Sequence, residues 1–109
     1  NGKVKRGYIG VAIAEVNAQV AASIGLENVA GVIVTELVKG GPAAQAGVEL
    51  YDIIVEFNGK KTNTLNELLN AVADTEIGSK TKIKVIRMQN DKKTERTLEV
   101  RVAENPDEG

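Results

Sequence analysis

The chain is organised around Arg6-Gly7-Tyr8-Ile9-Gly10-Val11-Ala12-Ile13, a glycine-punctuated turn that runs directly into a short apolar strand. Two glycines three residues apart permit positive φ angles, and successive backbone N–H groups in such a turn form a concave nest that receives anions. Tyr8, Ile9 and Val11 surround that polar spot with apolar surface. Backbone donors between apolar walls suit the end of a peptide chain, where a carboxylate stands beside a hydrophobic side chain.

The composition fits one globular domain that has no catalytic machinery of its own. The chain has 109 residues, of which 42% are hydrophobic, and this is enough for a single core. The net charge of −1 differs from the basic footprint of a nucleic-acid-binding domain. Histidine and cysteine are absent, which excludes Ser-His-Asp and Cys-His triads, thiolate zinc sites and disulfides. We therefore expect no catalysis by this segment, no cofactor, no metal and no nucleic-acid partner.

The two ends of the chain suggest a fragment of a longer protein. The longest apolar run, from Ala30 to Val34, is too short to cross a membrane, so we expect no membrane insertion by this domain. No basic and then apolar leader precedes the first turn, so the protein is either cytosolic or a fragment whose leader lies elsewhere. We expect linker residues at 1–4, one domain over 5–102, and a mobile acidic linker over 103–109, where Pro106 and a final glycine follow Glu104.

Alternating and β-branched segments predict a mainly β domain with two to three short helices, an α+β fold. Strands are expected at Val11–Val16 and Gly31–Val38, the second mostly buried. Between them, Asn17 is suited to cap a short packed helix over Ala18–Ile24. A second short helix is expected after Gly41, with Pro42 at its first position and Gly47 past its end. This glycine-rich turn lacks the lysine and the Ser/Thr of a phosphate-binding loop.

Two hairpins are expected in the second half of the chain. The segment Asp52–Lys61 alternates apolar and polar residues into the pair Asn58-Gly59, a strong signal for a tight turn. Its inward side chains are expected to be Ile53, Val55 and Phe57. A later pair of strands, Lys82–Arg87 and Thr97–Val102, flanks turn residues at 89–92.

Between the hairpins, a capping box at Thr64 and Glu67 predicts a helix from about Leu65 to Ala73. Its apolar residues recur at helical spacing and form one stripe. The stripe consists of Leu65, Leu68, Leu69 and Val72. In one interpretation the whole stripe is buried under the sheet, and in the other Leu68 faces the core while the remaining three form a wall of a groove. Spacing alone favours the first.

The order of these motifs resembles the PDZ domain of the HtrA (Deg, Do-like) serine proteases. The resemblance covers about Lys5 to Val102 and rests on the opening turn, on Gly41–Val48, on Asp52-Ile53-Ile54 and on Asn58-Gly59. It implies a small, partly open β-barrel of five or six strands flanked by two helices. It also implies the permuted bacterial topology, in which the ligand-binding strand comes first and the last strand completes the sheet.

The resemblance also implies a peptide-binding site. Tyr8-Ile9-Gly10-Val11 corresponds to the family's carboxylate-binding loop, and Val11, Ala12 and Ile13 to the strand that pairs with the peptide. The likeness favours the second interpretation of the helical stripe. The implied groove is lined by Ile9, Val11, Ile13, Leu65, Leu69 and Val72. Arg6 is either a support for the carboxylate or a solvated charge.

The implied ligands are C-terminal or unfolded polypeptide segments with hydrophobic ends, because every expected wall is aliphatic. The implied partner is a protease domain of the same chain, and the implied location is extracytoplasmic, in the periplasm or cell envelope. One departure is Tyr51, which stands before Asp52 where the family usually has glycine. Two alternatives stay open: a PDZ domain of another parent, such as a site-2 protease, a C-terminal processing protease or a secretion component, and a structural or oligomerising spacer without a ligand.

Overall fold

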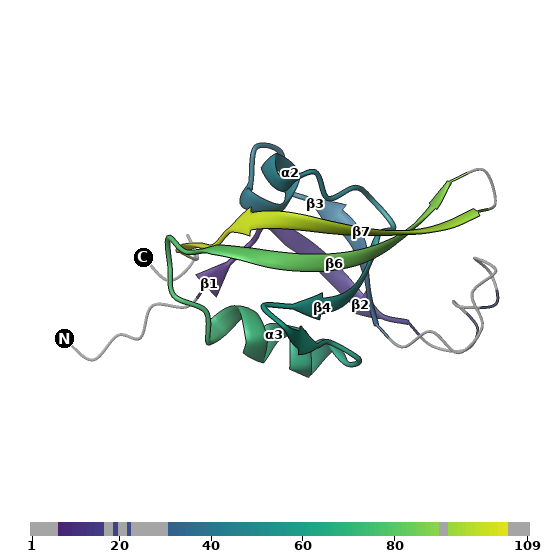
Figure 1. Cartoon of the computed structure of the whole chain (residues 1–109), viewed down its shortest axis with the longest axis horizontal. Coiled ribbons are helices and arrows are strands. Elements are labelled where there is room, and N and C mark those ends of the chain that lie inside the picture. The colour runs from purple at the N-terminus through teal and green to yellow at the C-terminus, as the bar shows by residue number, and fades with distance from the viewer. Residues whose placement is uncertain (1–6, 17–18, 20–21, 23–30, 90–91, 105–109) are drawn as a thin grey trace.

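A computed structural model describes residues 7–16, 19, 22, 31–89 and 92–104 (Figure 1). Its main sheet is antiparallel and open, and it does not close into a barrel. The strand order is β2 (Val11–Glu15), β3 (Val32–Leu37), β4 (Ile53–Phe57), β6 (Lys80–Gln89) and β7 (Lys92–Arg101), with β5 (Lys60–Lys61) paired to β4. This architecture confirms the predicted mainly β fold with short helices, in which the expected partly open barrel is an open sheet. Among the described residues, no helix is long and apolar enough to cross a membrane.

Two short helices lie on opposite sides of the sheet in Figure 1, and each begins where the sequence predicts. The helix α2 (Pro42–Ala46) has Gly41 at its N-cap, and Gly47 ends it with a φ of 102°. The helix α3 (Leu65–Ala73) begins at Thr64, whose hydroxyl accepts a hydrogen bond from the N–H of Glu67 at 3.1 Å. The helix predicted over 18–24 falls mostly outside the described residues, although Gln19 and Ala22 are helical.

Both predicted hairpins are present. In the first, Asn58 and Gly59 have φ angles of 53° and 79°, which are the positive values that a two-residue turn with matching strand twist requires. In the second, β6 and β7 pair along ten residues each, from Lys80 opposite Arg101 to Gln89 opposite Lys92. This hairpin begins earlier and extends further toward its turn than the predicted strands Lys82–Arg87 and Thr97–Val102.

The inward positions of β4 differ from the prediction because the strand contains a bulge. The pairing with β6 shifts between Ile54 and Glu56, so Val55 is an additional residue on the β4 side. The bulge places Ile54 and Phe57 on the same face, and both are fully buried in the main core. The prediction that Ile53 and Val55 share the face of Phe57 is therefore wrong. They contact a smaller cluster on the other face, around Ile33.

The two ends of the domain pair with each other. β1 (Gly7–Tyr8) and β8 (Ala103–Glu104) form a two-stranded antiparallel sheet beside α3. Ala103 and Glu104 are thus paired as a strand within the segment expected to be a linker, while residues 105–109 lie outside the described residues. A Cβ at Gly7 would collide with the carbonyl oxygen of Val72 and the side chain of Val102, so close packing of β1 against α3 requires glycine there.

Candidate functional site

Among the described residues, no strand lies beside one edge of β2. β2 is the first strand in the sheet order, and its described partner is β3 on the other side. The helix α3 packs beside β2 and leaves a groove between the two elements. The unpaired edge of a strand carries a row of N–H and C=O groups that another chain can pair with.

The groove has a volume of about 340 Å³, and the described residues that line it carry no charged side chain. Its lining consists of Gly7, Tyr8, Ile9, Gly10, Val11, Ile13, Leu68, Leu69, Val72 and Ala73. Three segments far apart in the sequence therefore supply one apolar surface: the opening turn, β2 and α3.

In the turn that lines the groove, the carbonyl groups of Ile9 and Gly10 are bonded within the described part of the chain, whereas their N–H groups are not. The carbonyl oxygen of Ile9 accepts a hydrogen bond from Ala43 N at 2.8 Å, and that of Gly10 accepts one from Val38 N at 2.9 Å. No described residue accepts a hydrogen bond from the N–H of Ile9 or Gly10. Gly10 has a φ of 78°, which L-residues seldom adopt, so glycine permits this turn. The arrangement leaves the amides available to an external acceptor.

The structure brings most of the predicted site residues together. Ile9, Val11, Ile13, Leu69 and Val72 all line the groove, and Tyr8 and Gly10 stand at its base. Ile9 is only 4% exposed and belongs to the main core, so it contributes both to the core and to the groove lining. Ala12 is exposed and outside the lining, and Arg6 lies outside the described residues.

The stripe on α3 is divided differently from either interpretation. Leu65 is absent from the groove lining and packs against the core, so its predicted place in the wall is not supported. Leu68 is 1% exposed yet lines the groove, whereas Leu69 is 50% exposed. Sequence reasoning missed Gly7 and Ala73 as lining residues. The spacing of four residues from Leu69 to Ala73 on one helix face was an available signal for the latter.

A further missed residue is Glu15, which lies at the end of β2, beyond the residues that line the groove. Its Oε1 accepts a hydrogen bond from the N–H of Leu65 at 3.0 Å, so it joins the last residue of β2 to the first residue of α3. An acceptor is favourable there because the first N–H groups of a helix lack intrahelical partners. The sequence did contain a signal for this placement. Side chains alternate between the two faces of a strand, so Glu15 points to the same face of β2 as Val11 and Ile13.

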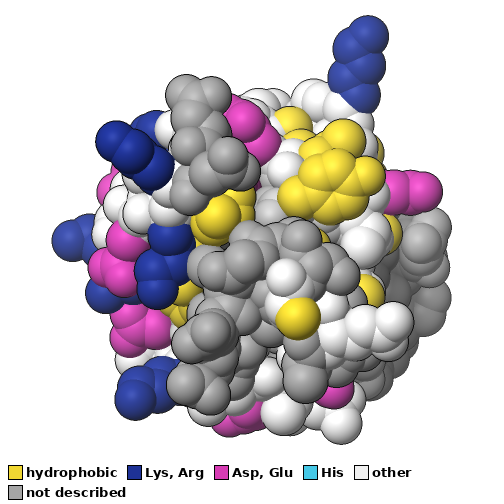
Figure 2. All heavy atoms as spheres, turned by 90° about the vertical axis from the view of Figure 1, so that its right-hand side faces the viewer, with side chains coloured by type: hydrophobic (Ala, Val, Ile, Leu, Met, Phe, Trp, Pro, Cys, Tyr) yellow, Lys and Arg dark blue, Asp and Glu magenta, His cyan; other side chains and the backbone are white. Residues whose placement is uncertain are grey.

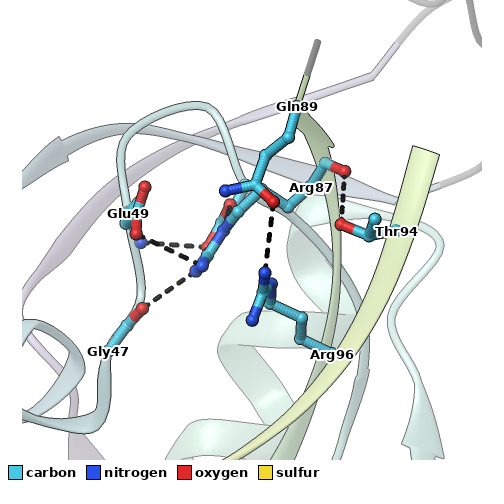
Figure 3. A network of polar contacts seen from close by, with 7 residues as sticks. Gly47, Glu49, Arg87, Gln89, Thr94 and Arg96 are labelled. Carbon is cyan, nitrogen blue, oxygen red and sulfur yellow. Dashed lines mark hydrogen bonds and ion pairs between the residues drawn. The ribbon is translucent and has the colours of Figure 1, made fainter. Parts of the chain in front are cut away.

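The buried charges of the domain lie away from the groove. Figure 3 shows Arg87 on β6 reaching toward the segment that joins α2 to β4. Its guanidinium bonds both carboxylate oxygens of Asp52, at 2.8 and 2.7 Å, and the carbonyl oxygen of Gly47 at 2.9 Å. These hydrogen bonds with Asp52 raise the pKa of Arg87 above its ordinary value, against the opposing effect of burial. The network is fully bonded and holds the segment to the sheet.

The remaining surface offers less for a ligand. A larger hollow of about 590 Å³ lies between α2 and the end of β7, but Glu99 and Arg101 interrupt its apolar lining. On the face drawn in Figure 2, cationic and acidic side chains are interspersed, and hydrophobic side chains form small separate groups. The groove beside β2 is therefore the site that combines a free strand edge, free amides and continuous apolar walls.

Comparison with known proteins agrees with this geometry. The profile of the PDZ domain family matches residues 7–102. A probable periplasmic serine endoprotease DegP-like from Pseudomonas savastanoi pv. phaseolicola is 39% identical over 109 residues, which is 100% of this chain and 22% of that protein. A protein of the same name from Chlamydia muridarum is 39% identical over 87 residues, 80% of this chain and 18% of that protein. The chain thus spans about a fifth of the length of these curated relatives.

Solved structures show the same fold. The HtrA-type protease AlgW with decapeptide superposes with a TM-score of 0.81 at 31% identity, covering 97% of this chain and 31% of that one. The HtrA3 PDZ domain bound to a phage-derived ligand (FGRWV) superposes with a TM-score of 0.75 at 22% identity, covering 93% of this chain and 88% of that one. The second likeness concerns the fold alone.

Proposed function

The chain belongs to the PDZ domain family, and from that premise we propose that it is a peptide-binding module for hydrophobic C-termini or exposed unfolded segments. The bound peptide adds a strand to the free edge of β2 and places its terminal carboxylate at the N–H groups of Ile9 and Gly10. The observation that carries this proposal is the edge of β2 that no described strand pairs with, directly beside an apolar groove. Strand addition supplies main-chain hydrogen bonds that do not depend on the sequence of the peptide, and the groove supplies selectivity for its side chains.

The walls of the groove define the preferred end of the peptide. Because they carry no charge, the terminal side chain is expected to be apolar, such as Val, Leu, Ile or Phe. Such side chains are mostly buried in folded proteins, so their exposure marks unfolded ones. One apolar anchor and a few strand hydrogen bonds, set against the ordering of a flexible peptide, correspond to an affinity of about a micromolar.

We place the domain in an HtrA-like serine endopeptidase outside the cytoplasm, as its substrate-binding or regulatory part. The names of the curated relatives, which are probable periplasmic serine endoproteases, support this parent. The decapeptide that accompanies AlgW in its solved structure supports the class of ligand. The adjacent protease domain of the same chain is then the intramolecular partner.

The direct test is a titration with two fluorescent peptides of one sequence that ends in valine. One has a free carboxylate and the other is amidated. The free acid is expected to bind at least about tenfold more tightly, because only a carboxylate receives charge-assisted hydrogen bonds from the amides. Equal affinity for both peptides would overturn the assignment of the carboxylate site.

A pair of matched variants tests the position of the site. Gly10→Glu puts a carboxylate at the proposed anion position, and we expect binding to fall by about tenfold or more through like-charge repulsion. Gly59→Glu is the control, because Gly59 has a φ of 79° against 78° for Gly10 and lies in the β4–β5 turn. It adds the same charge and backbone strain outside the groove. Both variants should keep a folded circular dichroism spectrum, and normal binding by Gly10→Glu would contradict the site.

A further inference from the structure

The side chain of Glu15 lies at the end of β2, just beyond the residues that line the groove. The proposed carboxylate position at Gly10 precedes β2, so a bound peptide ends where β2 begins and runs antiparallel to it. Val11, Ile13 and Glu15 alternate onto the face of β2 that meets α3. From Val11 to Glu15 there are four residue steps, or roughly 14 Å of strand.

This geometry sets the register of the peptide. Directly opposed residues of an antiparallel pair point to the same face of the sheet. With the last peptide residue beside Val11, the third from the end stands beside Ile13 and the fifth from the end beside Glu15. The second and fourth residues from the end point to the opposite face, which carries Ala12 and Ala14.

The carboxylate of Glu15 is held in place and only partly engaged. Oε1 receives the N–H of Leu65, and this bond fixes the side chain toward α3. Among the described residues, no lysine or arginine forms an ion pair with Glu15, and Oε2 has no hydrogen-bond partner. Oε1 accepts from one of the first N–H groups of α3, that of Leu65, and the Thr64 hydroxyl accepts from another, that of Glu67. The open oxygen therefore presents negative charge to the passing peptide.

We propose that Glu15 is a specificity-determining residue that favours lysine or arginine at the fifth position from the end of the bound peptide and disfavours glutamate or aspartate there. This inference rests on the proposed function, because it takes its register from strand addition to β2. The interaction is exposed to solvent, so it selects among ligands that are already anchored by their apolar end. It narrows an otherwise broad preference toward peptides with a basic residue at one defined position.

The test uses three fluorescent peptides that end in valine and differ only at the fifth residue from the end, which is lysine, alanine or glutamate. We expect affinity to fall in that order, by about two- to fivefold per step, as for an exposed ion pair. In Glu15→Gln the amide oxygen still accepts from Leu65, and the three affinities should converge. Raising the salt concentration to about 0.5 M should reduce the differences in affinity of wild type for the three peptides, because salt screens the ion pair.

Two controls separate the site from overall charge. Glu99→Gln removes the same charge from β7, the opposite outer strand, and should keep the wild-type order. A peptide with lysine at the fourth position from the end should bind wild type and Glu15→Gln equally. If the alanine peptide binds but wild type has equal affinity for all three peptides, the role of Glu15 is overturned and the proposed function stands. The same conclusion follows if Glu15→Gln keeps the wild-type differences in affinity. If the alanine peptide fails to bind, both are overturned.

Discussion

At the scale of the single residue, Tyr51 is the position where the sequence and the backbone conflict. Its φ is 69°, a left-handed value that costs an L-residue roughly 1 kcal/mol. Asn58 also has a positive φ, but asparagine tolerates this region because its short side chain can bond locally. The ring of Tyr51 is 66% exposed and offers little packing in return. The unusual tyrosine was visible in the sequence, whereas its backbone angle was not.

We expect Tyr51→Gly to stabilise the domain by about 0.5–1 kcal/mol, because glycine adopts this φ without strain and keeps the hydrogen bond from residue 51 N to Val34 O. The greater freedom of glycine in the unfolded chain offsets part of the gain. Urea unfolding followed by circular dichroism measures the difference. Tyr51→Ala is the control, since it removes the ring and retains the strain. A glycine variant no more stable than the alanine variant would show that the angle is not strained.

At the scale of the element, α3 shows what local sequence rules reach and where they stop. Its start was predictable because the capping box depends on residues within one turn, Thr64 and Glu67. Which of its leucines face the groove was not predictable, because that depends on how the helix is rotated against β2. The bulge in β4 escaped prediction for a similar reason, since it is defined by the pairing with β6. The periodicity of a segment predicts which residues share a face, but it does not predict which element packs against that face.

The groove face of α3 can be tested with two leucines of equal exposure, Leu69 on α3 and Leu50 outside the groove. We expect Leu69→Ala to weaken binding of a valine-ended peptide by about fivefold, because the wall loses part of the apolar area that the ligand would cover. Leu50 has the same exposure of 50% but lies outside the groove, so Leu50→Ala should leave the affinity unchanged. Both changes are at the surface and should shift the unfolding free energy by no more than about 0.5 kcal/mol. Fluorescence polarisation gives the affinities, and equal effects of the two variants would exclude Leu69 from the site.

At the scale of the whole molecule, contacts between distant segments complete what the local patterns leave open. The pairing of β1 with β8 joins the two ends of the domain, and neither strand is long enough to carry a pattern of its own. Asp52 and Arg87 are 35 residues apart, and each reads as one more charge in an alternating strand. Their burial became evident only once β4 and β6 were adjacent. The order of strands could be predicted from the family resemblance, but this ion pair could not.

The buried pair is expected to matter for the stability of the whole domain and not for its ligand. Asp52 is 1% exposed, and Asp52→Ala leaves the Arg87 guanidinium in a buried place with Gly47 and Glu49 as its remaining partners. We expect a loss of about 3 kcal/mol, because the buried guanidinium loses the carboxylate that bonds it at 2.8 and 2.7 Å and keeps only the exposed Glu49 as a charged partner. Arg87→Met removes that charge, so the double variant should be more stable than the sum of the single effects predicts, by about 2 kcal/mol.

Urea unfolding of the four proteins at pH 7 gives the coupling free energy, and the half-exposed pair Lys84 and Glu56, 3.0 Å apart, is the matched control. The coupling free energy of this control pair should be much smaller, because water screens it.

The pH dependence of the buried pair follows from the pKa of Arg87, which is raised mainly by its hydrogen bond with Asp52. The stability that the pair contributes is present below the ordinary pKa of arginine and is lost only as the pH rises through the raised pKa. The coupling should therefore be unchanged at pH 9. Additive single effects would show that the pair does not act as a unit, and a loss of peptide affinity in the folded double variant would show that it reaches the groove.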